Sequence, residues 1–264
     1  MTMLTVPAAV LRSEWIKLRT VRSTYVVLAV TLGLGLVLGL LDVISVTSHW
    51  ATMSAAARAG FDPVGDPLSG FQLAELGLGA LGVLAISTEY STGMIRGTLA
   101  ASPRRGTVFA AKALVLGLFA LTVSELCAFA AFFLGQAVLD RRNLGVSLLD
   151  HDVLRAVACA GLYMAVVAMV GFGLGALIRH TAGAMAAMFA VVFLAYPAAR
   201  AVEGFSYLPD HLLLINAATV LATTGAPAGQ HAARIPTLGF ACFDLVLYLV
   251  VFLGLGAWRV SRDA

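Results

Sequence analysis

The chain has 264 residues, of which 60% are hydrophobic and only 12% are charged. Soluble domains carry about 25% charged residues, so this composition excludes an ordinary soluble protein and predicts a chain that crosses a membrane several times. The net charge of +3 is too small to indicate a partner, and no basic patch predicts nucleic-acid binding.

The N-terminal segment Val10–Arg22 predicts an amphipathic helix. Leu11, Trp15 and Leu18 recur at helical spacing, and the basic residues lie off this stripe. Two roles fit this pattern: a helix that lies in the inner headgroup layer and contacts anionic lipid, or a charged flank that only sets the topology. Basic residues continue along the segment and no small-residue cleavage site follows, so we expect it to be retained rather than removed as a signal peptide.

Six apolar segments follow. Each is close to or above the length of about 17–25 residues that crosses the hydrocarbon core as a helix. They are rich in Leu, Ala, Val and Gly and show no period-two alternation, which argues against a β-barrel. We therefore expect an all-α membrane protein with a single transmembrane domain over residues 1–264. Its six spans are predicted at about residues 25–46, 70–88, 108–139, 153–178, 182–199 and 238–258.

The distribution of basic residues predicts the orientation of these spans. With a cytoplasmic N-terminus, eleven of the 17 basic residues lie on the inner side and six on the outer side. Cytoplasmic loops carry the excess of Lys and Arg, so both termini are expected in the cytoplasm.

The segment Arg200–Thr237 is then on the outer side. Its apolar piece "HLLLINAATVLA" has about 12 residues, which is too short to span. It predicts short re-entrant or surface helices, or a folded loop with buried leucines.

Several kinds of chemistry are absent from the sequence. Lys17 and Lys112 are the only lysines, and they follow Ile16 and Ala111, so no Gly-Lys-Ser/Thr phosphate loop exists. The histidines and cysteines lack metal-ligand spacing, and no Gly-x-Ser-x-Gly nucleophile motif is present. We therefore expect no enzymatic activity, no metal and no cofactor in this chain.

Four carboxylates lie in the apolar segments, and three of them, all except Asp42, are candidate polar groups. Glu125 lies 13 residues after Lys112, about 20 Å further along a helix and thus near mid-membrane, whereas Glu75 and Asp244 lie nearer the outer side. A charge at the bilayer centre costs at least about 2.5–3.5 kcal/mol. These residues are expected either to line a substrate path or proton site, or to form a hydrogen-bonded polar core between helices.

Glycines are dense in three of the spans, in the sequences "GLGLVLG", "GLGALG" and "GFGLG". Small residues let helix backbones approach closely in a membrane. The pattern predicts tight helix packing in preference to a substrate path or hinge.

The segment 87–105, "STEYSTGMIRGTLAASPRR", is unusually polar for this chain. A helix is expected from Glu89 to Leu99, and Pro103 would end it by removing a backbone donor and restricting the preceding residue. This segment is either a short helix on the inner face that offers a surface to a partner, or a solvated loop whose arginines set the topology.

The same segment resembles the first cytoplasmic loop of type-2 ABC exporter permeases, especially a group common in actinobacteria. The N-terminal "SEWIKLRTVRS" is similar to the connecting helix of that family, and "IRHTAGA" at 178–184 to its second inner turn. One departure is Met94, where many members have Thr. The positions that the resemblance assigns to ATPase coupling are Glu89, Tyr90, Gly93, Met94, Arg96, Thr98, Leu99, Pro103 and Arg105.

The resemblance implies a permease subunit in a bacterial plasma membrane. Two copies, or one copy and a related permease, would pair, and two separate ATPase subunits would bind ATP and Mg. The segment Glu89–Pro103 would be the coupling helix that the ATPases move. The cargo would be hydrophobic or amphipathic, such as a drug, an antibiotic or a lipid. The alternatives are a secondary transporter with Glu125 as its proton site, and a structural or assembly membrane protein.

Overall fold

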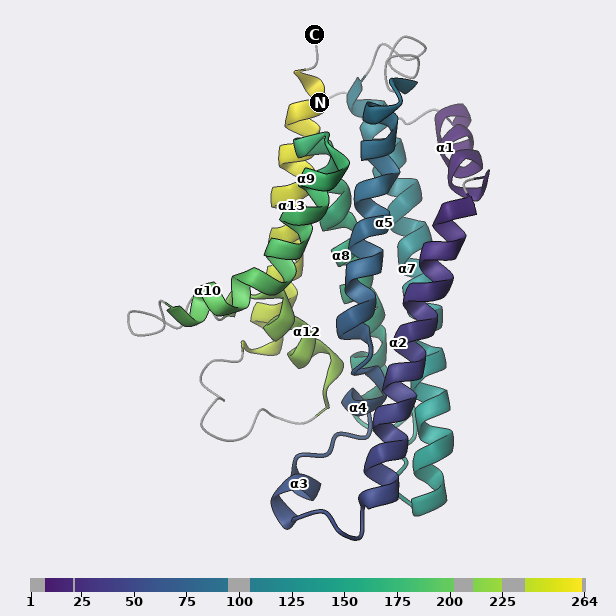
Figure 1. The fold of residues 1–264 in the computed structure, drawn as a ribbon, viewed down its shortest axis with the longest axis vertical. Coiled ribbons are helices and arrows are strands. Elements are labelled where there is room, and N and C mark those ends of the chain that lie inside the picture. Colours follow the sequence, from purple (N-terminus) through teal and green to yellow (C-terminus); the bar gives the residue numbers. More distant parts are fainter. Residues whose placement is uncertain (1–7, 21, 95–104, 202–210, 225–235, 263–264) are drawn as a thin grey trace.

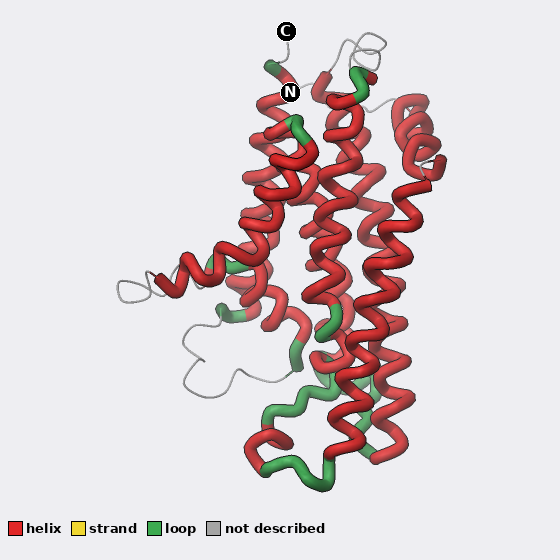
Figure 2. Tube along the Cα trace, in the orientation of Figure 1, coloured by secondary structure: helices red, strands yellow, loops and turns green. Residues whose placement is uncertain are grey.

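The computed structural model describes residues 8–20, 22–94, 105–201, 211–224 and 236–262. In these residues the regular structure is helical and no strand occurs, as Figure 2 shows. Six helices are long and apolar enough to cross a membrane, which confirms the multi-pass character predicted from composition. They are Thr24–His49, Gly65–Ser91, Arg105–Arg142, Val153–Ile178, Thr181–Ala199 and Leu238–Ser261.

The helices are labelled in Figure 1. In chain order they are α1 (Ala8–Thr20), α2 (Arg22–His49), α3 (Ala55–Ala59), α4 (Gly65–Leu68), α5 (Phe71–Ser91), α7 (Arg105–Leu139) with the 3₁₀ turn η1 (Asp140–Arg142), α8 (Val153–Ile178), α9 (Thr181–Phe189), the π-helical turn η2 (Ala190–Leu194), α10 (Ala195–Ala201), α12 (Leu214–Ala222) and α13 (Leu238–Ser261).

The long helices form a bundle with α8 at its centre. In the most apolar part of α8, 83% of the residues are buried, against 17% in α13. Helix α8 packs against α5, α7, α9 and α13. Figure 1 shows α1 and the last turn of α13 at one end of the bundle, here called the α1 end, and α3 at the other, here called the α3 end.

Helices α5 and α8 approach each other closely at their glycines. A Cβ atom added to Gly82 would lie 1.8 Å from the carbonyl oxygen of Ala168, and one added to Gly171 would lie 2.1 Å from that of Gly79. Neither position has room for any side chain. The tight packing predicted from the glycine-rich spans is therefore confirmed at this contact.

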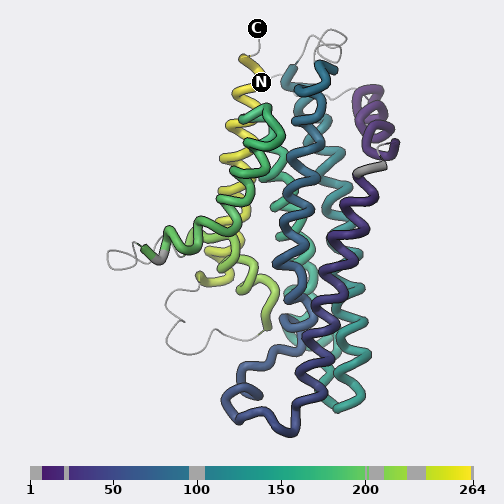
Figure 3. The backbone as a smooth tube through the Cα atoms, in the orientation of Figure 1, coloured from purple at the N-terminus to yellow at the C-terminus, as the bar shows by residue number. Residues whose placement is uncertain are grey.

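The fifth span is bent. Helix α9 continues through η2 into α10, which turns away from the bundle in Figure 3. Pro197 lies just beyond the π-helical turn, where it cannot donate a hydrogen bond to the carbonyl group four residues earlier. A π-helical turn next to a proline is a known cause of a kink.

Several helix ends differ by a few residues from the predicted ones, among them those of α7 and α5. Helix α7 has 35 residues, about 52 Å at about 1.5 Å per residue, so it extends beyond a hydrocarbon core of about 30 Å. Helix α5 continues to Ser91, and Glu89 lies in its last turn instead of opening a separate helix. Gly93 then has a φ of 72°, a left-handed conformation that ends α5. The remainder of the predicted coupling helix lies in residues 95–104, outside the described residues.

Candidate functional site

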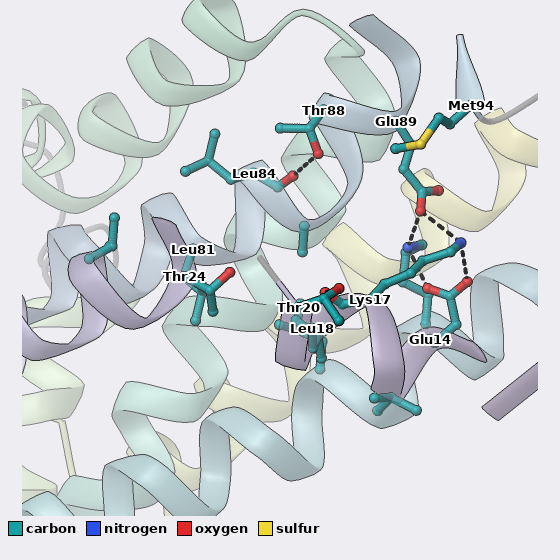
Figure 4. A pocket seen from close by; sticks show the side chains of 15 residues that line it. Glu14, Lys17, Leu18, Thr20, Thr24, Leu81, Leu84, Thr88, Glu89 and Met94 are labelled. Carbon is teal, nitrogen blue, oxygen red and sulfur yellow. Dashed lines mark hydrogen bonds and ion pairs between the residues drawn. The ribbon is translucent and has the colours of Figure 1, made fainter. Parts of the chain in front are cut away.

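Four charged side chains form a closed ring near the α1 end (Figure 4). Lys17 Nζ lies 2.7 Å from Glu14 Oε1 and 3.0 Å from Glu89 Oε1. Lys112 Nζ lies 2.5 Å from Glu14 Oε2 and 2.8 Å from Glu89 Oε1. Each ammonium group therefore lies between two carboxylates, and the ring has no net charge.

The ring is largely shielded from solvent. The side chains of Glu14, Glu89 and Lys112 are 3%, 4% and 8% exposed, and only Lys17 is more open, at 37%. Breaking a buried ion pair by removing one partner leaves an uncompensated charge. The ring therefore holds its helices together only while all of its charges are balanced.

Three helices supply the ring. Glu14 and Lys17 are three residues apart on α1, the spacing at which side chains on one helix face meet. Glu89 comes from the last turn of α5, and Lys112 from the third turn of α7. Glu14 is the buried residue of α1, so this helix packs on the bundle through a carboxylate as well as through the apolar residues that the sequence pattern singled out.

Lys17, like Glu14, lies on α1 and thus outside the six candidate membrane spans. Burial lowers the pKa of its ammonium group, but the hydrogen bonds and negative charges of Glu14 and Glu89 outweigh this effect and raise the pKa above its ordinary value of 10.5. Lys17 is therefore held in its charged form at neutral pH.

The end of α5 is also bound to the turn between α8 and α9. The guanidinium group of Arg179 lies over the ring of Tyr90, 5.2 Å from its centre, and donates a hydrogen bond to the carbonyl oxygen of Arg259 at 3.0 Å. Thr181 Oγ1 donates to Ser87 Oγ at 3.0 Å. The segment 87–94 and the turn at 178–181 are thus in contact through Ser87, Tyr90, Arg179 and Thr181.

The predicted coupling residues occupy different places. The carboxylate of Glu89 forms ion pairs with Lys17 and Lys112. Met94 lines a cavity beside the ring, and Arg105 is the first residue of α7. Gly93 follows the end of α5, and apart from its chain neighbours no atom of the described residues lies within 4 Å of the place that a Cβ atom would take there. The other four predicted coupling positions, Arg96, Thr98, Leu99 and Pro103, lie outside the described residues.

A cavity of about 310 Å³ adjoins the ring, between α1, α2, α5 and α7. Its polar side is formed by the ring itself. Its remaining wall is mostly apolar and includes Leu18, Leu81 and Leu84 (Figure 4). A cavity with charged groups on one side and aliphatic groups on the other suits an amphipathic molecule.

The three membrane carboxylates predicted from sequence lie apart, and no hydrogen bond joins them. Glu75 is buried and accepts a hydrogen bond from the hydroxyl group of Tyr163. Glu125 packs over Gly161, where a Cβ atom would lie 2.6 Å from the Glu125 Cδ. Asp244 is fully buried on α13. Each carboxylate therefore has its own surroundings, although Tyr163 and Tyr248 lie close enough to interact electrostatically between Glu75 and Asp244.

Among the described residues, no group of three or more His, Cys, Asp or Glu side chains is placed to hold a metal ion.

No protein-family model matches the chain, and no curated protein or solved structure is significantly similar to it. The functional interpretation therefore depends on the sequence motifs and on the geometry of the site.

Proposed function

We propose that this chain is the permease subunit of an ATP-driven exporter in a bacterial plasma membrane, with both termini in the cytoplasm. It would work with a separate ATPase subunit and a second permease copy. The sequence resemblance suggests the class. The structural observation that supports it best is that the ring of charges includes Glu89, the first residue of the predicted coupling segment, and Lys112, which follows the segment on α7.

The ring connects the predicted coupling segment to helices α1, α5 and α7, so a movement of the segment would be transmitted to the bundle. Glu89 lies just before residues 95–104 and Lys112 just after them, and both are bonded to Glu14 on α1 or to its neighbour Lys17. A push on the segment would displace the ends of α5 and α7 together, and α1 with them. An ATPase that closes on this segment would therefore move three helices as one unit.

The two cavities agree with transport of an amphipathic cargo. One lies beside the ring at the α1 end, and the other lies near the α3 end, under α12. The missing phosphate loop means that any ATP used must be bound by another chain. In this proposal no cofactor is held by the permease itself.

The test is coupling between ATP hydrolysis and the ring. The chain would be reconstituted in lipid nanodiscs with an ATPase encoded by a neighbouring gene, and ATP hydrolysis would be measured with and without the permease. The double variant E89Q/K112M removes one charge of each sign and leaves the Glu14–Lys17 pair. It should still assemble but lose most of the permease-dependent change in hydrolysis. R58Q, an exposed position on α3, is the matched control.

Two results would contradict the proposal. One is that the E89Q/K112M permease changes the rate of ATP hydrolysis by as much as the native permease does. The other is uptake into proteoliposomes of this chain alone, driven by a pH gradient and abolished by E125Q. The second result would establish the secondary transporter with Glu125 as its proton site.

A further inference from the structure

The cavity near the α3 end is lined by acidic groups that the proposed coupling mechanism does not use. Its volume is about 290 Å³, at the lower limit of ligand sites, which are usually about 300–1,000 Å³. It lies between the α3–α4 connection, α5, α8 and α12. Three carboxylates line it, Asp62, Asp66 and Glu75, and none of the described residues that line it is Lys or Arg.

Glu75 is placed to bind a ligand through one oxygen. The side chain is 2% exposed. Its Oε2 accepts the hydrogen bond of Tyr163, and its Oε1 has no hydrogen-bond partner. A buried carboxylate oxygen without a partner loses its hydration and gains nothing in return. A donor inside the cavity would satisfy it.

Asp62 offers a second acceptor. Its Oδ1 accepts from the backbone N–H of Val64 at 3.0 Å, while its Oδ2 is buried without a hydrogen-bond partner. Asp62 and Asp66 also lie close enough to repel each other electrostatically. Arg155 binds Asp152 and the carbonyl oxygen of Thr223, and it is not among the described residues that line the cavity.

The remaining wall is suited to a small apolar group. Leu68, Phe71, Ile215 and Ala218 line it beside the carboxylates. Helix α12, which contributes Ile215 and Ala218, is held over the cavity at both ends. Tyr248 donates a hydrogen bond to the carbonyl oxygen of Leu212 at 2.9 Å, and Arg155 donates to that of Thr223 at 3.0 Å.

We propose that this cavity binds an organic amine in its protonated form. The ammonium group would donate to Glu75 Oε1 and Asp62 Oδ2, and the aromatic or aliphatic part would lie against Phe71 and Ile215. The further statement that such an amine, cationic and amphipathic, is the transported cargo rests on the proposed function. Binding of the amine in the cavity does not depend on that function, because the ATPase takes no part in binding.

Binding would be measured by calorimetry with the full chain in nanodiscs of zwitterionic lipid, at about pH 7, against empty nanodiscs. The probes are 2-phenylethylamine, 2-phenylethanol and phenylacetate, which share a ring and differ in charge. We expect the amine to bind at least about tenfold more tightly than the alcohol, a difference of about 1.4 kcal/mol, and the anion not to bind.

Two variants test the acceptors. In E75Q the carbonyl oxygen can still accept from Tyr163, which leaves an NH₂ group facing the cavity, and in D62N one charge is lost. Each should weaken binding of the amine by about tenfold, whereas D150N, an exposed acid outside the cavity lining, should not change it. If E75Q does not fold, D62N decides, because Asp62 lies outside the long helices.

The proposal is overturned if the amine binds no more tightly than the alcohol, if it does not bind above the level of empty nanodiscs, or if both variants bind it as the native chain does. None of these results bears on whether an ATPase pairs with the chain. Conversely, failure to find a partner ATPase would leave amine binding intact.

Discussion

Lys112 Nζ lies 2.8 Å from Glu89 Oε1 across 23 residues of sequence, and both side chains are buried. Glu89 opens the segment Glu89–Pro103 that resembles a coupling helix, and the rest of that segment lies between the two residues. This pair therefore closes the α5–α7 connection at its base. Through Glu14 and Lys17 the same pair holds α1 on the bundle.

Loss of one charge from the ring should destabilise the chain. In K112M the carboxylates of Glu14 and Glu89 would lose their shared buried cation, and removing one partner of a buried pair costs about 3–5 kcal/mol. Thermal unfolding of the purified chain in detergent would show a clearly lower midpoint. The double variant E89Q/K112M should recover part of the loss, because its charges balance again.

K17M is the matched control for this prediction. Lys17 belongs to the same ring, but its side chain is 37% exposed, so water can compensate part of the lost interaction. Its unfolding midpoint should fall by less than that of K112M. An equal or larger fall would mean that burial does not set the strength of the ring.

The contribution of Lys17 to the stability of the ring should not change with pH near neutrality. The pKa of Lys17 is raised in the folded chain, so its stabilising contribution is complete below its unfolded pKa of about 10.5 and is lost only as pH rises through the higher folded value. The docking of α1 should therefore stay constant from about pH 7 to about pH 10 as far as Lys17 is concerned.

Trp15 reports this docking, since its ring lies 6.2 Å from that of Phe119 on α7. Its fluorescence would be followed with pH in a variant whose other two tryptophans, Trp50 and Trp258, are replaced by Phe. A change centred below about pH 10 that disappears in K17R would contradict the assignment of Lys17 as a firmly charged member of the ring.

The contact between α5 and α8 should not tolerate even one methyl group. In G82A the new Cβ would meet the carbonyl oxygen of Ala168 at 1.8 Å, and because both atoms belong to backbone or Cβ, the helices would have to separate. Overpacking costs about 1–3 kcal/mol and sometimes more. The unfolding midpoint in detergent should fall.

G254A provides the comparison, because nothing lies within 4 Å of a Cβ atom at Gly254. A helical Gly-to-Ala change without a clash is neutral or stabilising by up to about 1 kcal/mol. If G82A and G254A unfold at the same temperature, the close approach of α5 to α8 is wrong.

The predicted orientation places the α1 end in the cytoplasm. It would be tested in cells with a variant in which the three native cysteines, Cys127, Cys159 and Cys242, are replaced by Ala. A new cysteine at Ala56 on α3 should react with a membrane-impermeant maleimide in intact cells. A cysteine at Ser261, the last residue of α13, should react only after lysis. The reverse pattern would invert the topology.

The six spans could be predicted from sequence because a helix is required wherever a long apolar segment crosses lipid, whatever its neighbours are. Helix ends were less predictable. The end of α5 depends on Gly93 in a left-handed conformation, and the bend after α9 on Pro197, and both effects are local details that a hydropathy pattern does not resolve.

The ring could not be predicted because it joins side chains from three helices. Sequence reasoning treated Glu89 as a surface group for a partner, and treated Lys17 and Lys112 as flanking charges. One signal was present. Lys17 and Lys112 are the only lysines, and each lies near one end of an apolar segment. Because lysine is so rare in this chain, two lysines at the same depth as Glu14 and Glu89 indicate specific ion pairs better than a general topology signal.

The central claim is tested most directly by co-purification of a partner ATPase. The chain would be co-expressed with an ATPase encoded by a neighbouring gene and captured through a tag on the permease. The native chain should retain the ATPase. A variant with residues 94–103 replaced by a Gly/Ser linker of equal length should lose it while still eluting as a folded protein. Equal retention by both chains, or no ATPase captured by the native chain, would contradict the account.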